Sequence, residues 1–326
     1  MPYRYDPGDL APQEVEIAVT HCGICHSDLH LISNDWGISQ YPFIPGHEVV
    51  GTVTAVGSEV KSLQAGQRVG LGWQSNSCGV CEWCTRGMEN LCPDSEATCV
   101  HRNGGYADSV RANARFVIPI PEALSSEHAA PLLCGGITVY NPLRTHGVNP
   151  SSRVGVVGIG GLGHMGIKIA HAMGARVVAF TTSESKRAAA KQLGADEVVV
   201  SRHAEEMAAH AKSFDLILDT VAAPHDLDAL LVLLRRDGTL VLVGAPATPH
   251  PSPQVFDLIT RRRSLAGSMI GGIPETQEML DFCAEHGIVA DIELIRADQI
   301  NASYERMLRG DVKYRFVIDN ATLSAA

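Results

Sequence analysis

The sequence predicts an α/β protein made of two parts, and three observations lead to this prediction. Residues 15–120 carry short alternating strand-like runs between many Gly and Pro turns, which is typical of a β-rich domain. From Arg153 onward, strand-like and helix-like patterns alternate, as in a doubly wound parallel sheet. A glycine-rich turn joins the first strand and helix of that second part. The 326 residues are enough for two domains of about 150 residues each.

The strands and helices follow from residue periodicity. The clearest strands of the β-rich part are Val49–Val56 and Arg68–Leu71, and Tyr314–Asp319 near the end of the chain is also strand-like. The predicted strands of the second part are Arg176–Phe180, Glu197–Val200, Phe214–Asp219, Thr239–Gly244 and Ser264–Ile270. Its predicted helices are Glu184–Leu193, Asp226–Arg236, Val255–Arg263 and Glu275–His286. The chain shows no internal repeat and no low-complexity segment.

The glycine-rich turn indicates a dinucleotide site. A β-branched run leads into Gly158-Ile-Gly160-Gly161-Leu162-Gly163, and a helical pattern with Ile167, Ala170 and Met173 on one face follows and ends near Gly174. Such glycines allow a tight turn, a close approach of the backbone to a pyrophosphate, and close helix–strand packing. The helix N-terminus then offers free N–H groups to the phosphates. A glycine-rich turn without a ligand is the alternative.

The residues after the second strand indicate the cofactor. NAD sites usually carry an acidic residue there, whereas this chain has Thr181, Thr182 and Ser183, followed by Lys186 and Arg187. Hydroxyl groups and cations suit a 2′-phosphate, so NADP(H) is preferred over NAD(H). Alternatively, Ser183 caps the next helix while the two cations are solvated. Glu184, the nearest acid, keeps NAD(H) open.

Composition excludes several classes of protein. The formal net charge is −10 and there is no basic tail, which argues against a nucleic-acid binder. The short basic run Arg261–Arg263 is expected to be a solvated helix end. No apolar run is long enough for a membrane span, and Met1–Leu10 does not resemble a signal peptide. A cytoplasmic location is therefore expected.

Cysteine spacing predicts a closed metal site. Nine Cys accompany 14 His, and in a cytoplasmic chain clustered Cys more often bind metal than form disulfides. The pattern C-x2-C-x2-C-x7-C suits a structural zinc ion with four thiolate ligands and no open position. An iron–sulfur cluster or unrelated thiols are the alternatives. The ligands would be Cys78, Cys81, Cys84 and Cys92.

A dispersed second group could form a catalytic zinc site. Two thiolates, an imidazole and a nearby carboxylate give three firm ligands and one exchangeable position. The residues are Cys25, His47, Glu48 and Cys134. Spacing alone cannot bring them together, and from composition Cys134 reads as a buried core residue and His47 as a turn residue. Cys22, Cys99 and Cys283 are expected to be packing residues, although Cys22 and Cys25 also form a CxxC pair that could be redox-active.

Several motifs together resemble the zinc-dependent medium-chain alcohol dehydrogenases, in their cinnamyl-alcohol-dehydrogenase-like branch. They are Cys22-Gly-Ile-Cys-His-Ser-Asp28, Gly46-His-Glu-Val-Val-Gly51, the four-Cys lobe, Pro131-Leu-Leu-Cys-Gly135 and Gly158-Ile-Gly-Gly-Leu-Gly163. From about Val154 onward the chain resembles a bacterial broad-specificity NADPH-dependent aldehyde reductase. The resemblance covers nearly the whole chain. It implies a GroES-like catalytic domain (1–134 and 271–326), a Rossmann NADP-binding domain (135–270) and a homodimer.

The resemblance also implies roles for single residues. Cys25, His47 and Cys134 match the catalytic zinc ligands, and Glu48 matches the nearby carboxylate that can ligate zinc transiently. Asp28 matches the residue that orients the zinc-ligating His, while Ser27 and His30 match the two ends of a proton relay through a ribose hydroxyl of the cofactor. The positions that match cofactor-binding segments are Thr182, Lys186, Thr220, Gly244, Ser268 and Ile270.

The implied reaction is reduction of an aldehyde by hydride from NADPH at a zinc-polarised carbonyl, or its reverse. Trp36, Tyr41 and Trp73 could line a pocket for an aromatic or medium aliphatic substrate, or be packing residues. An NAD-dependent polyol or secondary-alcohol dehydrogenase and a non-catalytic redox sensor are the alternatives.

Family members usually carry about 20 more residues before the position of Tyr5, so an exposed sheet edge, or one covered by another element or subunit, is expected there.

Overall fold

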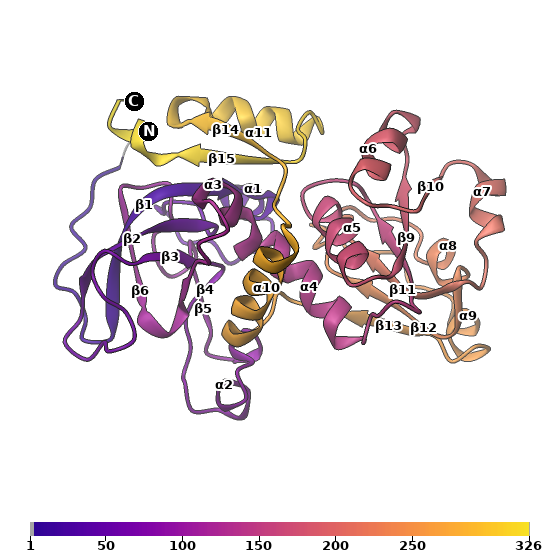
Figure 1. Cartoon of the computed structure of the whole chain (residues 1–326), viewed down its shortest axis with the longest axis horizontal. Coiled ribbons are helices and arrows are strands. Elements are labelled where there is room, and N and C mark those ends of the chain that lie inside the picture. Colours follow the sequence, from indigo (N-terminus) through magenta and orange to yellow (C-terminus); the bar gives the residue numbers. More distant parts are fainter. Residues whose placement is uncertain (1–2, 326) are drawn as a thin grey trace. The chain divides into compact units, whose positions relative to one another are not determined.

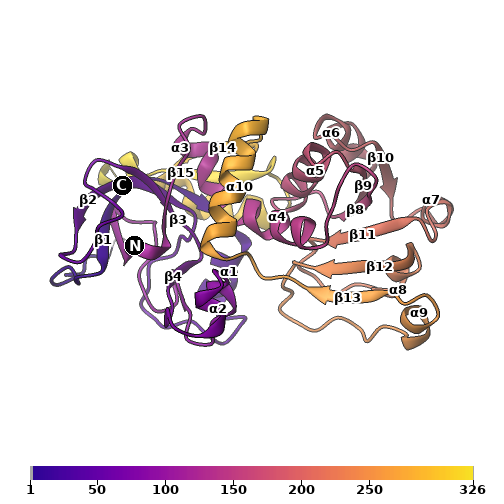
Figure 2. The same ribbon diagram turned by 60° about the horizontal axis from the view of Figure 1, so that its bottom comes forward.

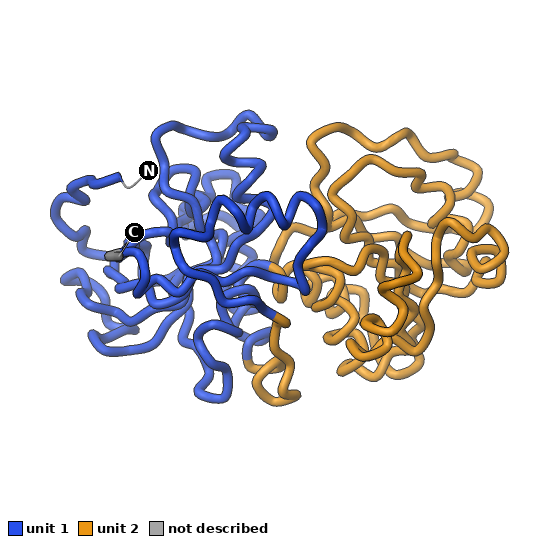
Figure 3. The backbone as a smooth tube through the Cα atoms, turned by 90° about the horizontal axis from the view of Figure 1, so that it is seen from above, with its two compact units in different colours: residues 1–134, 272–280, 292–326 blue, residues 135–271, 281–291 orange. Residues whose placement is uncertain are grey.

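The computed structural model describes residues 3–325, which divide into two compact units (Figure 3). The first unit holds the residues up to 134, residues 272–280 and the residues from 292 onward; the second holds 135–271 and 281–291. The sequence prediction also divided the chain after residue 134, but it assigned all of 271–326 to the first domain. Residues 281–291, a helix end and the following loop, instead group with the second unit.

One sheet organises the first unit (Figure 1). Its strand order is β14–β15–β1–β2–β3–β7, and β6 pairs with the first half of β1. The strands are β1 Glu14–Ile24, β2 Val49–Val56, β3 Arg68–Leu71, β6 Ser109–Asn113, β7 Val117–Pro119, β14 Ile292–Arg296 and β15 Arg315–Asp319. A separate small pair is β4 Gln74–Asn76 with β5 Glu96–Ala97. The predicted strands at 49–56 and 68–71 are confirmed, and the one predicted from Tyr314 begins at Arg315.

Strand β1 is the centre of this sheet. Its buried and half-buried residues alternate, so Val15, Ile17 and Val19 all enter the core together with Phe116. Antiparallel pairing with β2 covers one edge of β1, while β6 and β15 share the other. The backbone carbonyls of Pro7 and Gly8 accept hydrogen bonds from Arg111 on β6. Within residues 3–325, β1 therefore has strand partners along both edges, as in the alternative in which another element covers the edge.

The helices of the first unit are short. They are α1 His26–Ser33, α2 Glu82–Thr85, α3 Ser126–Ala129 and α11 Ile300–Leu308, with 3₁₀ turns η1 Glu89–Leu91, η2 Ala114–Phe116, η3 Ala130–Leu133, η5 Ala297–Gln299 and η6 Asn320–Ala325. Helix α11 packs Tyr304 and Met307 against Phe316 and Ile318 of β15. Helix α10, Ile273–His286, contains the boundary between the units and covers the predicted helix at 275–286.

The second unit is a six-stranded parallel sheet (Figures 1 and 2). The order β10–β9–β8–β11–β12–β13 runs outward in both directions from β8, which is the arrangement of a dinucleotide-binding doubly wound fold. The strands are β8 Arg153–Val157, β9 Arg176–Thr181, β10 Glu197–Val200, β11 Phe214–Asp219, β12 Leu234–Leu242 and β13 Ser264–Gly267. The helices are α4 Gly135–Thr145, α5 Gly163–Ala172, α6 Arg187–Gln192, α7 Ala204–Ala209, α8 Asp228–Leu231 and α9 Val255–Ile259, with the 3₁₀ turn η4 Glu184–Lys186 before α6.

Some predicted boundaries in this unit are wrong. The helix predicted at 226–236 is only α8, because Leu234 already pairs with Phe214 and begins β12, which ends at Leu242 rather than Gly244. The helix predicted at 184–193 is divided into η4 and α6. The strand predicted at 264–270 ends at Gly267, and Ile270 has a left-handed backbone with φ of 39°.

The basic run is the clearest correction. Helix α9 ends at Ile259, so Arg261–Arg263 lies beyond it, and Arg263 is buried, with 3% of its side chain exposed. Its guanidinium donates hydrogen bonds to the backbone carbonyls of Leu234, Asp257 and Val232. This arginine therefore joins the loop after α9 to the start of β12 instead of being solvated.

Of the helices in residues 3–325, none is long and apolar enough to cross a membrane.

Replacing Arg263 by Met should lower the free energy of unfolding by about 2 kcal/mol, because three backbone carbonyls lose a charged hydrogen-bond donor. The matched control is Arg262→Met, since Arg262 is 76% exposed and pairs only with exposed Asp237; its loss should stay within about 1 kcal/mol. Urea unfolding followed by circular dichroism measures both variants. Equal losses would show that burial of Arg263 contributes nothing.

Candidate active site

Four side chains from separate parts of the first unit converge. Cys25 follows β1 at the N-terminus of α1, His47 and Glu48 directly precede β2, and Cys134 follows η3. One ligand atom from each lies within 4.8 Å of the others, and the two Sγ atoms are 3.9 Å apart. All four residues are buried. The fold thus brings together the dispersed set Cys25, His47, Glu48 and Cys134, which spacing alone could not.

The donor atoms of this set fit a zinc ion. His47 Nδ1 lies 3.2 Å from Asp28 Oδ1, while its buried Nε2 has no hydrogen-bond partner among residues 3–325. An imidazole held through one nitrogen with the other left open is the usual arrangement of a metal-ligating His. Two thiols and this imidazole are the ligand types that zinc prefers. Hydrogen bonding with Cys134 is the largest of the effects that hold the pKa of Cys25 well below its usual range, which favours the thiolate form that binds metal.

Asp28 holds this arrangement in place. The carboxylate is fully buried and accepts hydrogen bonds from the backbone N–H groups of Cys25 (2.9 Å) and Gly46 (3.2 Å). It also accepts one from the Tyr106 hydroxyl, at 3.1 Å. Burial by itself lowers the pKa of His47, but the charges of Asp28 and Cys134 outweigh it and raise that pKa well above its usual value. Asp28 therefore orients both ligand-bearing segments.

Glu48 is paired with a residue that the sequence analysis missed. Its Oε1 accepts a hydrogen bond from buried Arg315, while Oε2 has no hydrogen-bond partner among residues 3–325. Burial raises the pKa of Glu48 to about 7, and the Arg315 charge opposes that rise. The signal for Arg315 was a charged residue inside the apolar strand that ends at Asp319. Tyr106 was also missed, and no motif marks it.

The two predicted relay residues lie on α1. Ser27 Oγ is 3.6 Å from Cys25 Sγ, so its hydroxyl lies beside the ligand set. His30 Nδ1 is 2.7 Å from Asp35 Oδ2, and the ring stacks on Trp36 with centroids 4.8 Å apart. Residues three apart on a helix lie on the same side, so Ser27 and His30 share a face of α1.

Two aromatic residues lie next to this group. Trp73 meets the His47 ring edge-on at 5.0 Å, and Trp36 meets Trp73 at 6.3 Å. Tyr41 is different, because it is 60% exposed and its hydroxyl donates to the carbonyl of Ile32 on α1 at 2.7 Å. Trp36 and Trp73 thus remain candidates for the substrate pocket, whereas the contacts of Tyr41 favour a packing role.

The four-Cys lobe is also assembled. Cys78, Cys81, Cys84 and Cys92 offer Sγ atoms within 4.8 Å of one another, and none of them is in a disulfide. The backbone N–H groups of Cys81 and Cys84 point to the Sγ atoms of Cys78 and Cys81 at 3.4 and 3.5 Å. Backbone N–H groups of Val80 and Cys81 lower the pKa of Cys78 to about 7. Such donors stabilise thiolates, so the lobe fits the closed zinc site.

The remaining cysteines are buried. Cys22, Cys99 and Cys283 each have an exposed fraction of 0%, which confirms that they are core residues.

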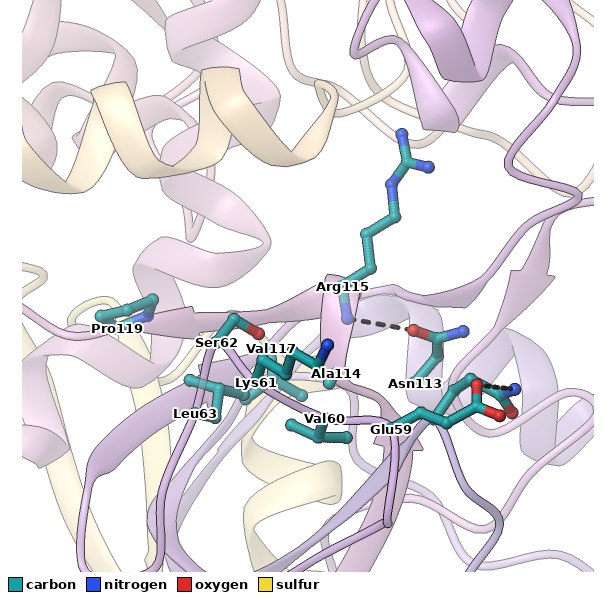
Figure 4. Close-up of a pocket in the computed structure, with 11 residues that line it drawn as sticks. Glu59, Val60, Lys61, Ser62, Leu63, Asn113, Ala114, Arg115, Val117 and Pro119 are labelled. Atoms are coloured by element: carbon teal, nitrogen blue, oxygen red, sulfur yellow. Dashed lines mark hydrogen bonds between the residues drawn. The ribbon is translucent and has the colours of Figure 1, made fainter.

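One surface groove lies outside both clusters (Figure 4). It has a volume of about 530 Å³ and is lined by residues 59–63 together with residues around β6 and β7. The Arg115 side chain extends away from the groove (Figure 4) and donates to the Cys84 carbonyl and to Glu89 of the four-Cys lobe. Arg115 therefore supports the lobe.

The glycine-rich turn in the second unit has the shape that the motif predicts. Gly158 has φ of 88°, and a Cβ on Gly163 would lie 1.9 Å from the Gly158 carbonyl oxygen, so only glycine fits there. A Cβ on Gly160 would meet no atom within 4 Å, which leaves the backbone open to an approaching group. Leu162 is the N-cap of α5, after Gly161, and Thr220 Oγ1 donates to the Val157 carbonyl beneath the turn at 2.7 Å.

The residues after β9 divide into two sets. Lys186 Nζ donates to the carbonyl of Ile159 in the glycine turn at 3.0 Å, and burial lowers its pKa. Ser183 makes no capping hydrogen bond through its side chain; its Oγ contacts Ser185 Oγ at 2.7 Å, and its backbone N–H donates to Thr181 Oγ1. Thr182 is exposed. Arg187 instead pairs with both Glu184 and Glu206, so its charge is already matched.

The other predicted cofactor positions follow β12 and β13. Gly244 and Ser268 follow the ends of these strands, and the carbonyl of Ile270 accepts a hydrogen bond from Asn141. Carboxyl ends of parallel strands are where doubly wound folds bind ligands. Thr220, Gly244 and Ser268 all lie at this edge of the sheet, as does the glycine turn.

Two family models match the chain. The alcohol dehydrogenase GroES-like domain matches residues 11–122, and the zinc-binding dehydrogenase domain matches residues 161–285. Among curated proteins, aldehyde reductase YahK of Escherichia coli K12 is 62% identical over 98% of this chain and 94% of its own length.

Solved structures agree with this. A cinnamyl alcohol dehydrogenase of Sorghum bicolor is 44% identical, with a TM-score of 0.95 over 98% of this chain and 94% of that one. The Helicobacter pylori cinnamyl alcohol dehydrogenase complexed with NADP(H) is 37% identical, with a TM-score of 0.89 over 96% and 92%. The expected fold class, a GroES-like domain with a Rossmann domain, is confirmed. The chain belongs to the zinc-dependent alcohol dehydrogenase family of oxidoreductases.

Proposed function

We propose that this protein transfers hydride between NADP(H) and aldehydes or primary alcohols, with aromatic or medium aliphatic substrates. The observation that carries the proposal is the buried group of Cys25, His47 and Cys134, in which His47 Nε2 is left open. The name of the Escherichia coli relative, an aldehyde reductase, and the NADP(H) complex of the Helicobacter pylori relative support it.

The proposal includes two zinc ions. Cys25, His47 and Cys134 would hold the catalytic ion, and the four-Cys lobe would hold a structural one. When bound, the catalytic ion supplies Lewis-acid polarisation of the carbonyl. Asp28 orients His47, and Arg315 balances Glu48, which is close enough to replace an exchangeable ligand.

Protonation of the product oxygen is assigned to Ser27. Its hydroxyl lies beside Cys25 and would donate its proton, which His30 would resupply from solvent. Asp35 holds the imidazole of His30 through Nδ1, which leaves Nε2 as the nitrogen that exchanges protons.

NADP(H) is the proposed cofactor. Lys186 is the cation next to the glycine turn, and positions 181–183 hold Thr, Thr and Ser, none of them acidic. A 2′-phosphate would gain a charge-assisted hydrogen bond there. Arg187 is excluded from the primary phosphate contacts because two carboxylates already surround it.

A cytoplasmic homodimer that binds no nucleic acid completes the proposal. The sheet of the second unit ends at β13, and the neighbouring α9 exposes Val255, Phe256 and Ile259. An edge strand beside exposed apolar residues is suited to pairing with a second copy.

The wild-type protein should reduce a panel of aromatic and aliphatic aldehydes with NADPH, and Cys25→Ser should abolish this reduction. The variant should lose about one zinc ion per chain while still binding NADPH, because Cys25 belongs to the first unit and the glycine turn to the second. Steady-state assays, metal analysis and NADPH fluorescence measure these quantities.

Cys283→Ala is the control, since this buried thiol lies outside both clusters. Full activity in Cys25→Ser would refute the proposal, and activity only on polyols with NAD⁺ would favour the alternative dehydrogenase.

Ser27→Ala should lower kcat by about 10²-fold or more with zinc content unchanged, because general acid–base groups contribute at that level. The pH dependence of kcat should change as well, since another proton donor then limits the step. A pH profile identical to that of the wild type would argue against the relay.

Lys186→Ala should raise the KM for NADPH about tenfold, the effect of losing one charge-assisted contact of about 1.5 kcal/mol. The KM for NADH should change little, because NADH has no 2′-phosphate. Lys191→Ala is the matched control, since this exposed lysine lies five residues further along the chain, in α6. Equal effects on both cofactors would contradict a role in phosphate recognition.

A further inference from the structure

A carboxylate and two imidazoles meet at one end of the sheet in the second unit. Asp219 is the last residue of β11, His225 lies in the loop that follows it, and His250 lies in the loop after β12. One ligand atom from each lies within 4.8 Å of the others. Neither the proposed reaction nor the two proposed zinc sites uses these residues.

Asp219 carries a buried carboxylate that is only half satisfied. The residue has an exposed fraction of 0%. Its Oδ1 accepts a hydrogen bond from the backbone N–H of Val221 at 3.1 Å, while Oδ2 has no hydrogen-bond partner in the described chain. An unsatisfied buried carboxylate oxygen is unfavourable, so a positive charge is needed next to it.

The tautomer of His225 places a lone pair toward that oxygen. Its Nδ1 lies 2.9 Å from the backbone carbonyl of Ala223, and only a protonated Nδ1 can donate to a carbonyl. In the neutral ring, Nε2 is then an acceptor. Nε2 is 3.0 Å from Asp219 Oδ2, yet the two atoms lack the alignment of a hydrogen bond. Two acceptors at this distance repel each other, so the pair needs a positive charge: either a proton on Nε2, which hydrogen bonding to Asp219 favours by raising the pKa of His225, or a metal ion between the two atoms.

The same pattern marks the catalytic group. Among the buried side-chain atoms of residues 3–325 that lack a hydrogen-bond partner, the imidazole nitrogens are His47 Nε2 and His225 Nε2. Nδ1 of His47 contacts the Asp28 carboxylate, and Nδ1 of His225 contacts the Ala223 carbonyl. Each cluster also contains a carboxylate oxygen without a hydrogen-bond partner among the described residues, Glu48 Oε2 in one and Asp219 Oδ2 in the other. This arrangement fixes a ligating imidazole before a metal binds.

His250 supplies the third donor from a second loop. Its ring meets the His225 ring at right angles with centroids 4.8 Å apart, and its Nδ1 accepts a hydrogen bond from the backbone N–H of His225 at 3.4 Å. Proline precedes each histidine in the loop, at positions 224 and 249, and fixes the backbone φ at that preceding position. From these observations we propose that Asp219, His225 and His250 form a further metal site for a divalent transition-metal ion such as Zn²⁺ or Co²⁺.

The donor set decides which ions fit. One carboxylate oxygen and two imidazole nitrogens suit Zn²⁺, Co²⁺ or Ni²⁺, whereas Mg²⁺ and Ca²⁺ prefer oxygen ligands throughout. A tetrahedral ion with ligand distances of about 2.0–2.1 Å separates its ligands by about 3.3 Å, which is close to the 3.0 Å between Nε2 and Oδ2. Three protein ligands leave one position open, so the ion should exchange.

A second acid–histidine cluster in the same unit serves as a contrast. Glu184, His203 and Glu206 also lie close together, but Arg187 pairs with both carboxylates there, and all three cluster residues are exposed or half-buried. In that cluster the Arg187 guanidinium already supplies the positive charge that balances the two carboxylates. An ion bound by Asp219, His225 and His250 would instead join the loops 220–225 and 244–250. These two loops already lie close together, because a Cβ on Gly244 would lie 2.4 Å from the Val221 carbonyl oxygen.

The test is a Co²⁺ titration of the full-length protein after dialysis against a weak chelator has removed exchangeable zinc and metal analysis shows two zinc ions per chain. We expect one added Co²⁺ per chain with no loss of zinc, and visible cobalt absorption without the thiolate-to-cobalt bands that Cys ligands produce. Thermal unfolding in excess Co²⁺ should shift upward, because the ion binds only the folded state. His225→Gln and His250→Gln should each weaken Co²⁺ binding at least tenfold.

The matched control is His203→Gln, which should leave Co²⁺ binding unchanged. His250→Gln alters a half-buried loop residue, so its circular dichroism without metal provides the check on folding. The proposal is overturned if no Co²⁺ beyond the zinc content binds, if the bound Co²⁺ shows thiolate bands or displaces zinc, or if His203→Gln abolishes uptake. If no Co²⁺ binds and NMR titrations show a raised pKa for His225, then a proton, and not a metal ion, lies between His225 Nε2 and Asp219 Oδ2.

Discussion

The buried carboxylate of Asp28 is the interaction on which the rest of the site depends. A carboxylate without solvent is unfavourable unless its oxygens are satisfied, and the fold meets this requirement with donors from three separate segments. The backbone N–H groups of Cys25 and Gly46 and the hydroxyl of Tyr106 all point to it, and His47 Nδ1 lies beside it. Since the first two segments carry the thiol of Cys25 and the imidazole of His47, satisfying Asp28 also positions the ligands. The site is therefore organised by the protein itself.

A second buried charge pair completes the first unit. Glu48 and Arg315 come from opposite ends of the chain, and their pairing joins the start of β2 to β15. A Cβ on Gly23 would lie 2.0 Å from Glu48 Oε2, so the glycine between Cys22 and Ile24 provides the space for this carboxylate. In the second unit the start of α5 packs directly against the glycine turn, because a Cβ on Gly163 would lie 1.9 Å from the Gly158 carbonyl oxygen. Gly23 and Gly163 thus each have a steric cause that can be stated in atoms.

Local patterns predicted the elements that are apolar and regular. The strands at 49–56, 197–200 and 214–219 have the predicted limits, because each buries a β-branched or apolar run that no neighbouring turn disturbs. The failures occur where a tertiary contact decides the local conformation. Arg263 satisfies three carbonyls from other segments, and Leu234 is drawn into β12 by pairing with Phe214, so the local helical pattern does not decide either region. Arg187 likewise reads as a phosphate ligand until Glu206 approaches it from another helix.

The sequence by itself determined the residue types of the site, the glycine turn and the order of the domains, because these depend on short-range spacing and backbone geometry. Four cysteines within 15 residues must lie close together whatever the rest of the chain does. Only the tertiary structure decided that Cys134 joins Cys25 across 109 positions, that Arg315 balances Glu48, and that Asp219 faces His225 and His250. These contacts arise from sheet pairing and loop packing between distant segments, and neither periodicity nor composition contains that information.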